Sequence, residues 1–192
     1  MYDFQLSEKF PCSPNELFER TLYNFDEYEK YAPNVTRVEV ISREPLPDGR
    51  EFITAQIFAR AAIPAPIRAV FNMSPEMSWK EYYNADAANR TVDWRVETPV
   101  FTEHVDCGGT SSVTGAARGC ELRITGSMKI NIDGVRGIPP SVARAVCVML
   151  EPFIGNMVTL NLKKYFGACG RRWRKKRRKS ESGLEERNGQ PS

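Results

Sequence analysis

Hydrophobic and polar residues alternate with a period of two along most of this chain, a pattern typical of β-strands. Residues 120–132 are the clearest case, because apolar side chains from Leu122 to Ile132 share one face and polar side chains share the other. The pattern predicts strands over residues 3–10, 35–43, 51–60, 77–83, 91–97, 100–114 and 120–132. Turn sequences such as Asp48-Gly49 separate these segments, so we expect an antiparallel sheet.

Two of these segments depart from simple alternation. Residues 51–60 carry apolar side chains on both faces, so this strand is either covered on both sides or lines an apolar cavity. Gly108 and Gly109 loosen the sixth segment and predict a β-bulge there.

A helix is predicted directly after the first strand. Ser13 is placed to cap it, Pro14 takes the first helical position, and Glu16 lies three residues after the cap. The helical spacing weakens near Asn24, so we expect a break there and a second short helix over residues 25–31.

The last periodic segment, residues 139–166, is an amphipathic helix with apolar residues at spacings of three and four. Pro152 predicts a kink in it, and Gly167 and Gly170 predict its end. A helix that follows an antiparallel sheet has to lie across the sheet's face, because each has an apolar side to bury. The sequence therefore predicts an α+β fold with a curved seven-stranded antiparallel sheet around a long C-terminal helix.

Charge divides the chain near the predicted end of this helix. Residues 171–192 carry nine lysines and arginines and three glutamates, a net charge of +6, whereas residues 1–170 carry 18 basic and 21 acidic residues, a net charge of −3. A segment so rich in charge cannot bury a core of its own. We therefore expect one domain over residues 1–167 and a disordered polybasic tail over residues 168–192.

The five cysteines and the single histidine form no metal-binding pattern, so we expect neither a metal nor a cofactor. The cysteines are typical of buried thiols in a reducing compartment, although a Cys107–Cys120 bridge between neighbouring strands stays open. We find no secretory signal and no apolar run long enough to span a membrane. The expectation is an intracellular monomer in the cytoplasm, at a membrane surface or in the nucleus.

Two segments resemble the START-like, or SRPBCC, superfamily, whose helix-grip fold is also that of the birch-pollen allergen. FPCSPNELFERTLYNFDEYEKY at residues 10–31 is similar to its first strand and capped helix. GCELRITGSMKINIDGVRGIPPSV at residues 119–142 is similar to its final strand and helix entry. The nearest likeness is to a bacterial START-like family of uncharacterised function. A weaker likeness, to PRELI-type phospholipid-transfer domains, rests on residues 34–50 and on Trp79 and Glu81.

The resemblance implies an apolar pocket between the sheet and the last helix. Members of the superfamily bind lipids, sterols, polyketides or hormones, and a minority are cyclases or other enzymes. We therefore hypothesise that this protein binds, or binds and transfers, a lipid or another hydrophobic small molecule. Aromatic side chains opposite flexible methionines suit an adaptable cavity. The candidate lining residues are Phe52, Phe58, Phe71, Trp79, Tyr83, Trp94, Met128, Met149, Phe153 and Met157.

A polyketide-cyclase-like enzyme is the alternative hypothesis. His104 is predicted to lie in a strand with Asp106 on the same face, and such a pair serves as an acid or base if it faces the cavity. No phosphate-binding glycine loop and no GxSxG motif accompanies the pair. The binding hypothesis is therefore the main one, and no catalytic residue is assigned.

Two further segments keep more than one interpretation. Residues 61–75 are apolar and rich in proline, so they form either a permanent cover of the core or a gate to the cavity. The basic run is a solvated end, an anchor on an anionic membrane, or a nuclear-localisation or nucleic-acid segment. Its contact residues would be Arg171, Arg172, Trp173, Arg174, Lys175, Lys176, Arg177, Arg178 and Lys179.

Overall fold

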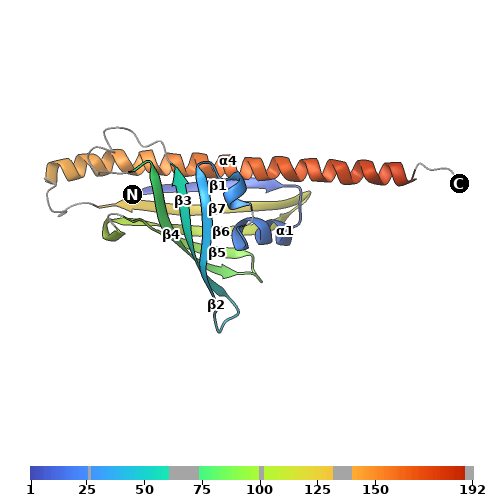
Figure 1. The fold of residues 1–192 in the computed structure, drawn as a ribbon, viewed down its shortest axis with the longest axis horizontal. Helices are drawn as coiled ribbons and strands as arrows, with labels where there is room; N and C mark the ends of the chain where they lie inside the picture. Colours follow the sequence, from blue (N-terminus) through green and yellow to red (C-terminus); the bar gives the residue numbers. More distant parts are fainter. Residues whose placement is uncertain (26, 61–73, 100–101, 132–139, 189–192) are drawn as a thin grey trace.

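The computed structural model describes residues 1–25, 27–60, 74–99, 102–131 and 140–188. Its strands form one antiparallel sheet in the order β1-β7-β6-β5-β4-β3-β2, and α4 lies along one face of it (Figure 1). This arrangement confirms the predicted α+β helix-grip fold. The strands are β1 (Tyr2–Phe10), β2 (Val35–Pro45), β3 (Glu51–Arg60), β4 (Glu76–Asp86), β5 (Thr91–Glu97), β6 (Val105–Ala116) and β7 (Gly119–Ile130). The helices are α1 (Pro14–Phe18), the π-helical η1 (Glu19–Tyr23), α2 (Tyr28–Tyr31), the 3₁₀ turn η2 (Thr102–His104) and α4 (Pro140–Asn188).

Most strand predictions hold, and the exceptions have local causes. The strands predicted over residues 51–60 and 91–97 are confirmed at both ends. β6 begins at Val105, later than predicted, because the turn η2 precedes it. The bulge predicted at Gly108 and Gly109 is wrong, since both residues pair in unbroken register with β5 and β7.

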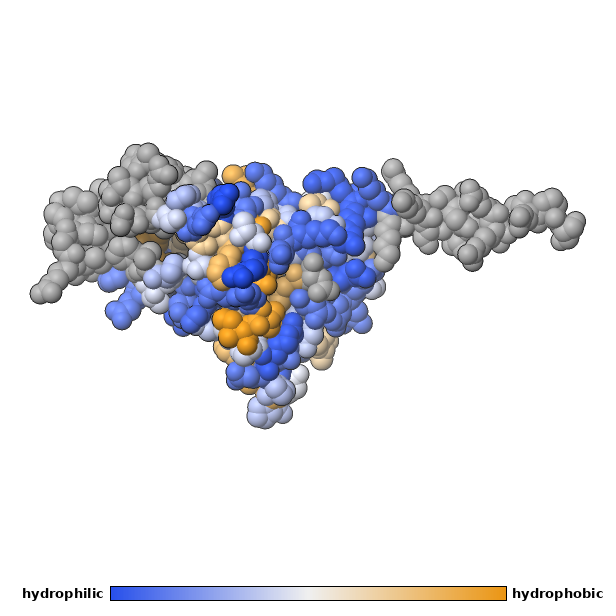
Figure 2. All heavy atoms as spheres, viewed as in Figure 1, coloured by the Kyte–Doolittle hydropathy of each residue, from blue (hydrophilic) through white to orange (hydrophobic). Residues whose placement is uncertain are grey.

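The edge strand β2 carries the register shifts instead. One of them falls between Val40 and Ser42. Val40 and Ile41 are 43% and 55% exposed, and Figure 2 shows hydrophobic atoms on the visible face over the region where Figure 1 places β2. A bulge twists an edge strand and hinders pairing with the strand of another molecule. The irregular register of β2 therefore hinders association of other strands with this partly apolar edge.

The predicted helix start is confirmed. Ser13 Oγ accepts a hydrogen bond from the Glu16 amide at 3.2 Å, and Pro14 opens α1. The helix widens into η1, and the chain then turns at Phe25, whose φ is +60°. Such a backbone is unfavourable for a bulky side chain and cannot continue a helix. α2 is accordingly shorter than the helix predicted over residues 25–31.

The core lies between the helices and one face of the sheet, which we call the inner face. Along β3 every second residue from Ile53 to Ala59 is buried, and the residues between them are only half-buried. Burying a large apolar side chain contributes about 1.5–3 kcal/mol. The helices supply Leu17, Phe18, Tyr165, Phe166 and Cys169 to this core.

A close approach fixes α4 on the first and last strands of the chain. A Cβ added at Gly155 would lie 2.2 Å from the Tyr2 ring, so only glycine fits there. The Tyr2 hydroxyl donates a hydrogen bond to Asn156 Oδ1 at 3.0 Å, and the Ile130 amide donates one to Glu151 Oε1 at 2.7 Å. The main packing of α4 on the sheet is therefore against β1 and β7.

α4 does not end where the sequence predicts. It continues through Gly167 and Gly170 to Asn188, and it is not interrupted at Pro152 (Figure 1). The helix end predicted at the two glycines is wrong, and a helix occupies the segment expected to be disordered. A glycine costs a helix only about 1 kcal/mol. Tertiary packing offsets that cost here, because Trp173 is 7% exposed.

An ion pair between an exposed guanidinium and a buried carboxylate holds α4 beyond the glycines. Glu27 is 5% exposed, and Arg172 Nη1 lies 2.5 Å from each of its carboxylate oxygens. The Arg172 guanidinium also lies 5.7 Å from the centre of the Tyr31 ring. A buried carboxylate without its cation is strongly destabilising, so this pair ties α4 to α2. The division into a domain over residues 1–167 and a separate tail over residues 168–192 stays a prediction.

Candidate functional site

Three polar side chains follow one another along the inner face of β4. Trp79, Glu81 and Tyr83 alternate with outward residues, and we call these three the Glu81 cluster. In the register with β3, Glu81 lies opposite Ala55 and Tyr83 opposite Ile53, which are both fully buried. A carboxylate on this face needs hydrogen-bond donors, because burying an unpaired charge is costly.

Both oxygens of Glu81 accept hydrogen bonds within the cluster. Trp79 Nε1 donates to Oε1 at 2.7 Å, and the Tyr83 hydroxyl donates to Oε2. Burial raises the pKa of Glu81 above its ordinary value, and the two hydrogen bonds oppose this shift only in part. The cluster thus holds a carboxyl group that binds a proton more readily than a surface carboxylate does.

We expect Glu81→Gln to become more stable relative to the unchanged protein as the pH rises. A carboxyl whose pKa is raised on folding stabilises the folded state below its unfolded pKa, and this contribution is lost as the pH rises through the folded pKa. The free energy of unfolding of the protein minus that of Glu81→Gln should therefore fall as the pH rises above the ordinary pKa of a glutamate. Urea unfolding at a series of pH values measures this difference.

Glu121→Gln is the matched control with the opposite sign. Glu121 on β7 accepts a hydrogen bond from the Ser7 hydroxyl, which lowers the pKa of Glu121. Its contribution to stability is present above its unfolded pKa and is lost as the pH falls. A pH-independent difference for Glu81→Gln would contradict a carboxyl whose pKa is raised at this position.

Tyrosine hydroxyls from three elements lie on the same side of the sheet. Burial raises the pKa of Tyr28 on α2, Tyr83 on β4 and Tyr165 on α4 well above the ordinary value, and Glu81 adds to the shift for the first two. The Tyr28 and Tyr165 rings meet edge to face at 5.4 Å. Among the described residues the buried Tyr165 hydroxyl has no nitrogen or oxygen partner and lies near the Cys169 thiol. α2, α4 and β4 therefore each contribute a neutral tyrosine hydroxyl to the region between the helices and the inner face of the sheet.

Four of the predicted lining residues lie on the inner face. Tyr83 and Met128 are buried there, and Trp79 and Trp94 are half-buried against the core. Tyr83 and Trp94 lie directly opposite each other on β4 and β5. A Cβ added at Gly109 would come within 2.8 Å of the Trp94 ring, so this indole lies close against the sheet. The structure thus brings these four residues onto the face that carries α4.

The assignment of Phe52 and Phe58 to the cavity wall is wrong. Both point to the outer face of β3, opposite to Ile53 and its buried neighbours. The Phe52 ring stacks on Tyr82 at 6.1 Å, and the Arg37 guanidinium lies 4.1 Å from the centre of the Phe58 ring. These aromatic side chains pack on the outer surface of the sheet and cannot line a space below α4.

The structure describes only some of the remaining residues that were predicted to line the cavity. Met149 is 53% exposed on α4, so its assignment to the wall is wrong. Phe71 lies outside the described residues, as do residues 61–73 of the predicted gate over residues 61–75. The side chains of Phe153 and Met157 lie outside them as well.

Sequence reasoning missed the polar part of the site. Glu81 occupies a position in phase with Trp79 and Tyr83, and an acidic residue at an inward position of an alternating strand is a visible signal. Cys107 is the second inward residue that was missed, and burial, with a contribution from Glu81, raises its pKa to about 11. Tyr28 could not be assigned, because only the tertiary fold brings α2 near β4.

His104 and Asp106 do not form the predicted pair. His104 ends η2, and its Nδ1 lies 2.6 Å from the Asn131 carbonyl oxygen. Asp106 is exposed and precedes the buried Cys107 on β6. Since successive residues of a strand point to opposite faces, Asp106 points outward. The acid–base pair expected in the cavity is therefore wrong.

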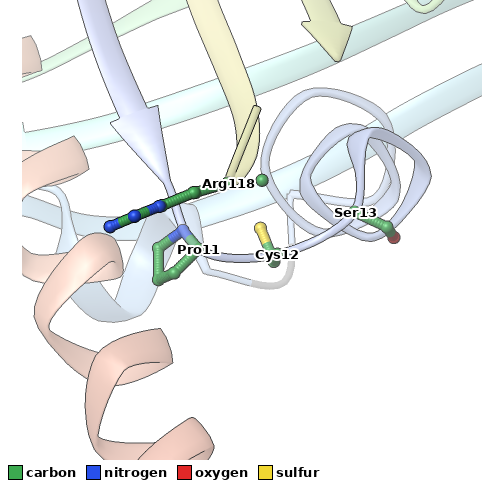
Figure 3. Close-up of a pocket in the computed structure, with 5 residues that line it drawn as sticks. Pro11, Cys12, Ser13 and Arg118 are labelled. Carbon is green, nitrogen blue, oxygen red and sulfur yellow. The ribbon is translucent and has the colours of Figure 1, made fainter. Parts of the chain in front are cut away.

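One surface hollow among the described residues, of about 390 Å³, lies between the loop after β1 and the β6–β7 hairpin (Figure 3). Cys12 Sγ lies there, 3.8 Å from Cys120 Sγ, and the Arg118 side chain extends past the loop. Burial raises the pKa of Cys12, which makes its thiol a poor nucleophile. The bridge between Cys107 and Cys120 is excluded by the register, because Cys120 pairs with Gly115 on β6.

A second hollow, of about 520 Å³, lies over β1, β7 and β6. Gly108, Gly109 and Gly126 form its floor, and polar residues such as Gln5 and Thr125 form its rim. It opens on the outer face, because Gln5 and Thr125 are exposed and alternate with the buried residues of β1 and β7. Neither hollow is the apolar pocket that the sequence predicts.

The predicted contact residues of the basic run have different surroundings. Trp173 is buried, and Arg172 is paired with Glu27, so neither is placed as a free membrane or nucleic-acid contact. The exposed basic residues are Arg171, Arg172, Arg174 and Lys175, of which Arg172 is paired with Glu27. The side chains of residues 176–179 lie outside the described part of the chain, and contact with a membrane or nucleic acid stays a prediction.

The described residues contain neither a metal-binding cluster nor a membrane-spanning helix. They contain no group of three or more histidine, cysteine, aspartate or glutamate side chains placed to hold a metal ion. None of the helices among them combines the length and apolar character that crossing a membrane requires.

A family described as "Protein of unknown function (DUF2505)" matches residues 5–158, a stretch that runs from β1 into α4. A search of curated proteins finds no match to this sequence.

Solved structures share the fold at low sequence identity. The Zhui aromatase/cyclase from Streptomyces sp. R1128 is 14% identical with a TM-score of 0.65, over 89% of this chain and 94% of that one. A START superfamily protein from Mycobacterium smegmatis is 10% identical with a TM-score of 0.57, over 88% and 97%. Ara h 8.0201 is 16% identical with a TM-score of 0.53, over 87% and 96%. These similarities confirm the START-like helix-grip fold.

Proposed function

The chain belongs to the DUF2505 family, and we propose that it binds a hydrophobic small molecule, such as a lipid, between the inner face of its sheet and α4. The observation that carries this proposal is the incomplete burial of the inner face. Trp79 and Trp94 pack against the core yet stay half-buried, as does Val96. A close-packed core leaves no such apolar surface uncovered.

The packing of α4 supports the same proposal. Among the described residues its main contacts with the sheet are on β1 and β7, whereas Trp79, Trp94 and Val96 belong to β4 and β5. Ligand sites are mostly apolar with a few polar groups that orient the ligand, and the Glu81 cluster supplies such groups. The fold shared with a START superfamily protein is consistent with this use. The enzyme alternative gains no support from His104 and Asp106, which do not share a face.

Val96→Trp is designed to fill the proposed space. Val96 on β5 lies opposite Glu81 on β4 and points inward, whereas its neighbour Arg95 is exposed and points outward. We expect the unchanged protein to bind decanol in isothermal titration calorimetry. Val96→Trp should weaken decanol binding about tenfold or more. A loss of about 1.4 kcal/mol of binding free energy is enough to lower the affinity tenfold.

Arg95→Trp is the matched control, since it adds the same indole one residue away on the outer face. It should bind decanol as the unchanged protein does. Equal affinities of all three proteins, or no decanol binding by the unchanged folded protein, would contradict the proposed site. Native mass spectrometry of protein purified from cells would then identify the natural ligand class through any co-purified molecule.

A further inference from the structure

We infer that Glu81 recognises an amine, so that the ligand is an apolar molecule with a cationic ammonium group at one end. This inference rests on the proposed function, because it names the polar end of the same ligand. It is argued from the hydrogen bonds, the charge and the aromatic surroundings of Glu81.

The Glu81 carboxylate has unused capacity to accept hydrogen bonds. A carboxylate offers about four acceptor positions, two on each oxygen. Among the described residues, Trp79 fills one position on Oε1 and Tyr83 fills one on Oε2. One position on each oxygen is left for a further donor, and an ammonium group brings three donors.

The chain treats the buried carboxylate of Glu27 differently from the half-buried one of Glu81. Glu27 is paired with the guanidinium of Arg172, and Arg20 lies 3.7 Å away as a second cation. Glu81 has neutral donors instead, and among the described residues no cation lies within 4 Å of it. The buried Glu27 carboxylate is neutralised within the chain, as a buried charge requires. The half-buried Glu81 carboxylate has neutral donors only, so an ammonium group on the ligand would supply its cation.

The aromatic neighbours of Glu81 favour a cation over an anion. The Trp79 and Tyr83 side chains flank Glu81 along β4, and Tyr28 is close enough for Glu81 to raise the Tyr28 pKa. Ammonium groups are attracted to aromatic faces within about 6 Å. A carboxylate ligand would be repelled by Glu81, and an alcohol would offer it a single donor.

A purely structural role is the competing explanation. In that case Glu81 would only hold the Trp79 and Tyr83 side chains through its two hydrogen bonds, and the protein would show no preference among ligand head groups. Decylamine, decanol and decanoate distinguish these explanations, because they share one chain and differ only in the head group.

We expect the unchanged protein at neutral pH to bind decylamine about tenfold more tightly than decanol, and decanoate most weakly, as measured by isothermal titration calorimetry. Glu81→Gln should weaken decylamine binding about tenfold and leave decanol affinity nearly unchanged. Glu97→Gln is the matched control, because Glu97 on β5 accepts a hydrogen bond from the Tyr82 hydroxyl at 2.7 Å on the outer face. It should keep the preference for the amine.

Each outcome decides one of the two proposals. Equal affinity of the unchanged protein for decylamine and decanol, or an amine preference that survives Glu81→Gln, would overturn the role of Glu81 and leave the binding function standing. No binding of decanol by the unchanged folded protein would overturn the function itself. If Glu81→Gln does not fold, the ranking of the three probes on the unchanged protein still decides the inference.

Discussion

Gly109→Ala is expected to lower the free energy of unfolding by about 3 kcal/mol. The alanine Cβ would lie 2.1 Å from the Thr125 carbonyl oxygen and 2.6 Å from the Gly126 Cα. Both atoms belong to the backbone of β7, which cannot move away without breaking the ladder with β6. The Trp94 ring, 2.8 Å from the same point, has to move as well. Urea unfolding followed by circular dichroism measures the loss.

Gly115→Ala is the matched control on the same strand. A Cβ at Gly115 meets nothing within 4 Å, and the residue does not have a positive φ. Its substitution should change stability by no more than about 0.5 kcal/mol. Equal stabilities of the two variants would contradict the close approach of Trp94 to β6 and β7, and with it the geometry of the inner face.

The positions of the strands follow from the sequence because alternation and turn signals are local. The bounds of β3 and β5 and the cap at Ser13 were predicted on this basis and are confirmed. The role of Gly108 and Gly109 could not be predicted in the same way. A glycine in a strand marks either a bulge or a close approach by another group, and only the position of Trp94 decides between them.

The two faces of β3 show why the site was predicted only in part. Apolar residues occupy both faces, so alternation alone could not tell Phe52 on the outer face from Ile53 on the inner one. β4 did carry a usable signal, since Glu81 is in phase with two aromatic residues. The tyrosines of α2 and α4 lie near it only through the tertiary fold, which no local pattern contains.

The prediction of a disordered tail over residues 168–192 rested on the composition of the basic run. Eight of the nine residues from 171 to 179 are basic, which favours disorder in an isolated segment. However, Phe166, Cys169 and Trp173 continue the spacing of three and four, and all three are buried. The helical period thus extends into the run, and its apolar positions outweigh the charge that surrounds them.

Trp173→Ala is accordingly expected to destabilise the protein by about 3–5 kcal/mol, the usual cost of removing a buried tryptophan side chain. The Trp173 ring is 7% exposed and meets the Phe10 ring edge to face at 5.5 Å. Phe10 is itself 2% exposed at the end of β1, so the indole closes the core where α4 passes β1. Thermal and urea unfolding of the full chain measure the loss.

Arg174→Ala, at the exposed neighbouring position, is the matched control and should stay within about 0.5 kcal/mol of the unchanged protein. The alternative role of Trp173, as an anchor in a membrane interface, leads to the opposite result. An anchor that is free of the core can be removed without changing the unfolding transition, and only binding to anionic vesicles would fall. An unchanged transition in Trp173→Ala would therefore restore the division of the chain at residue 168, whereas a large loss makes the first turns of the basic run part of the domain.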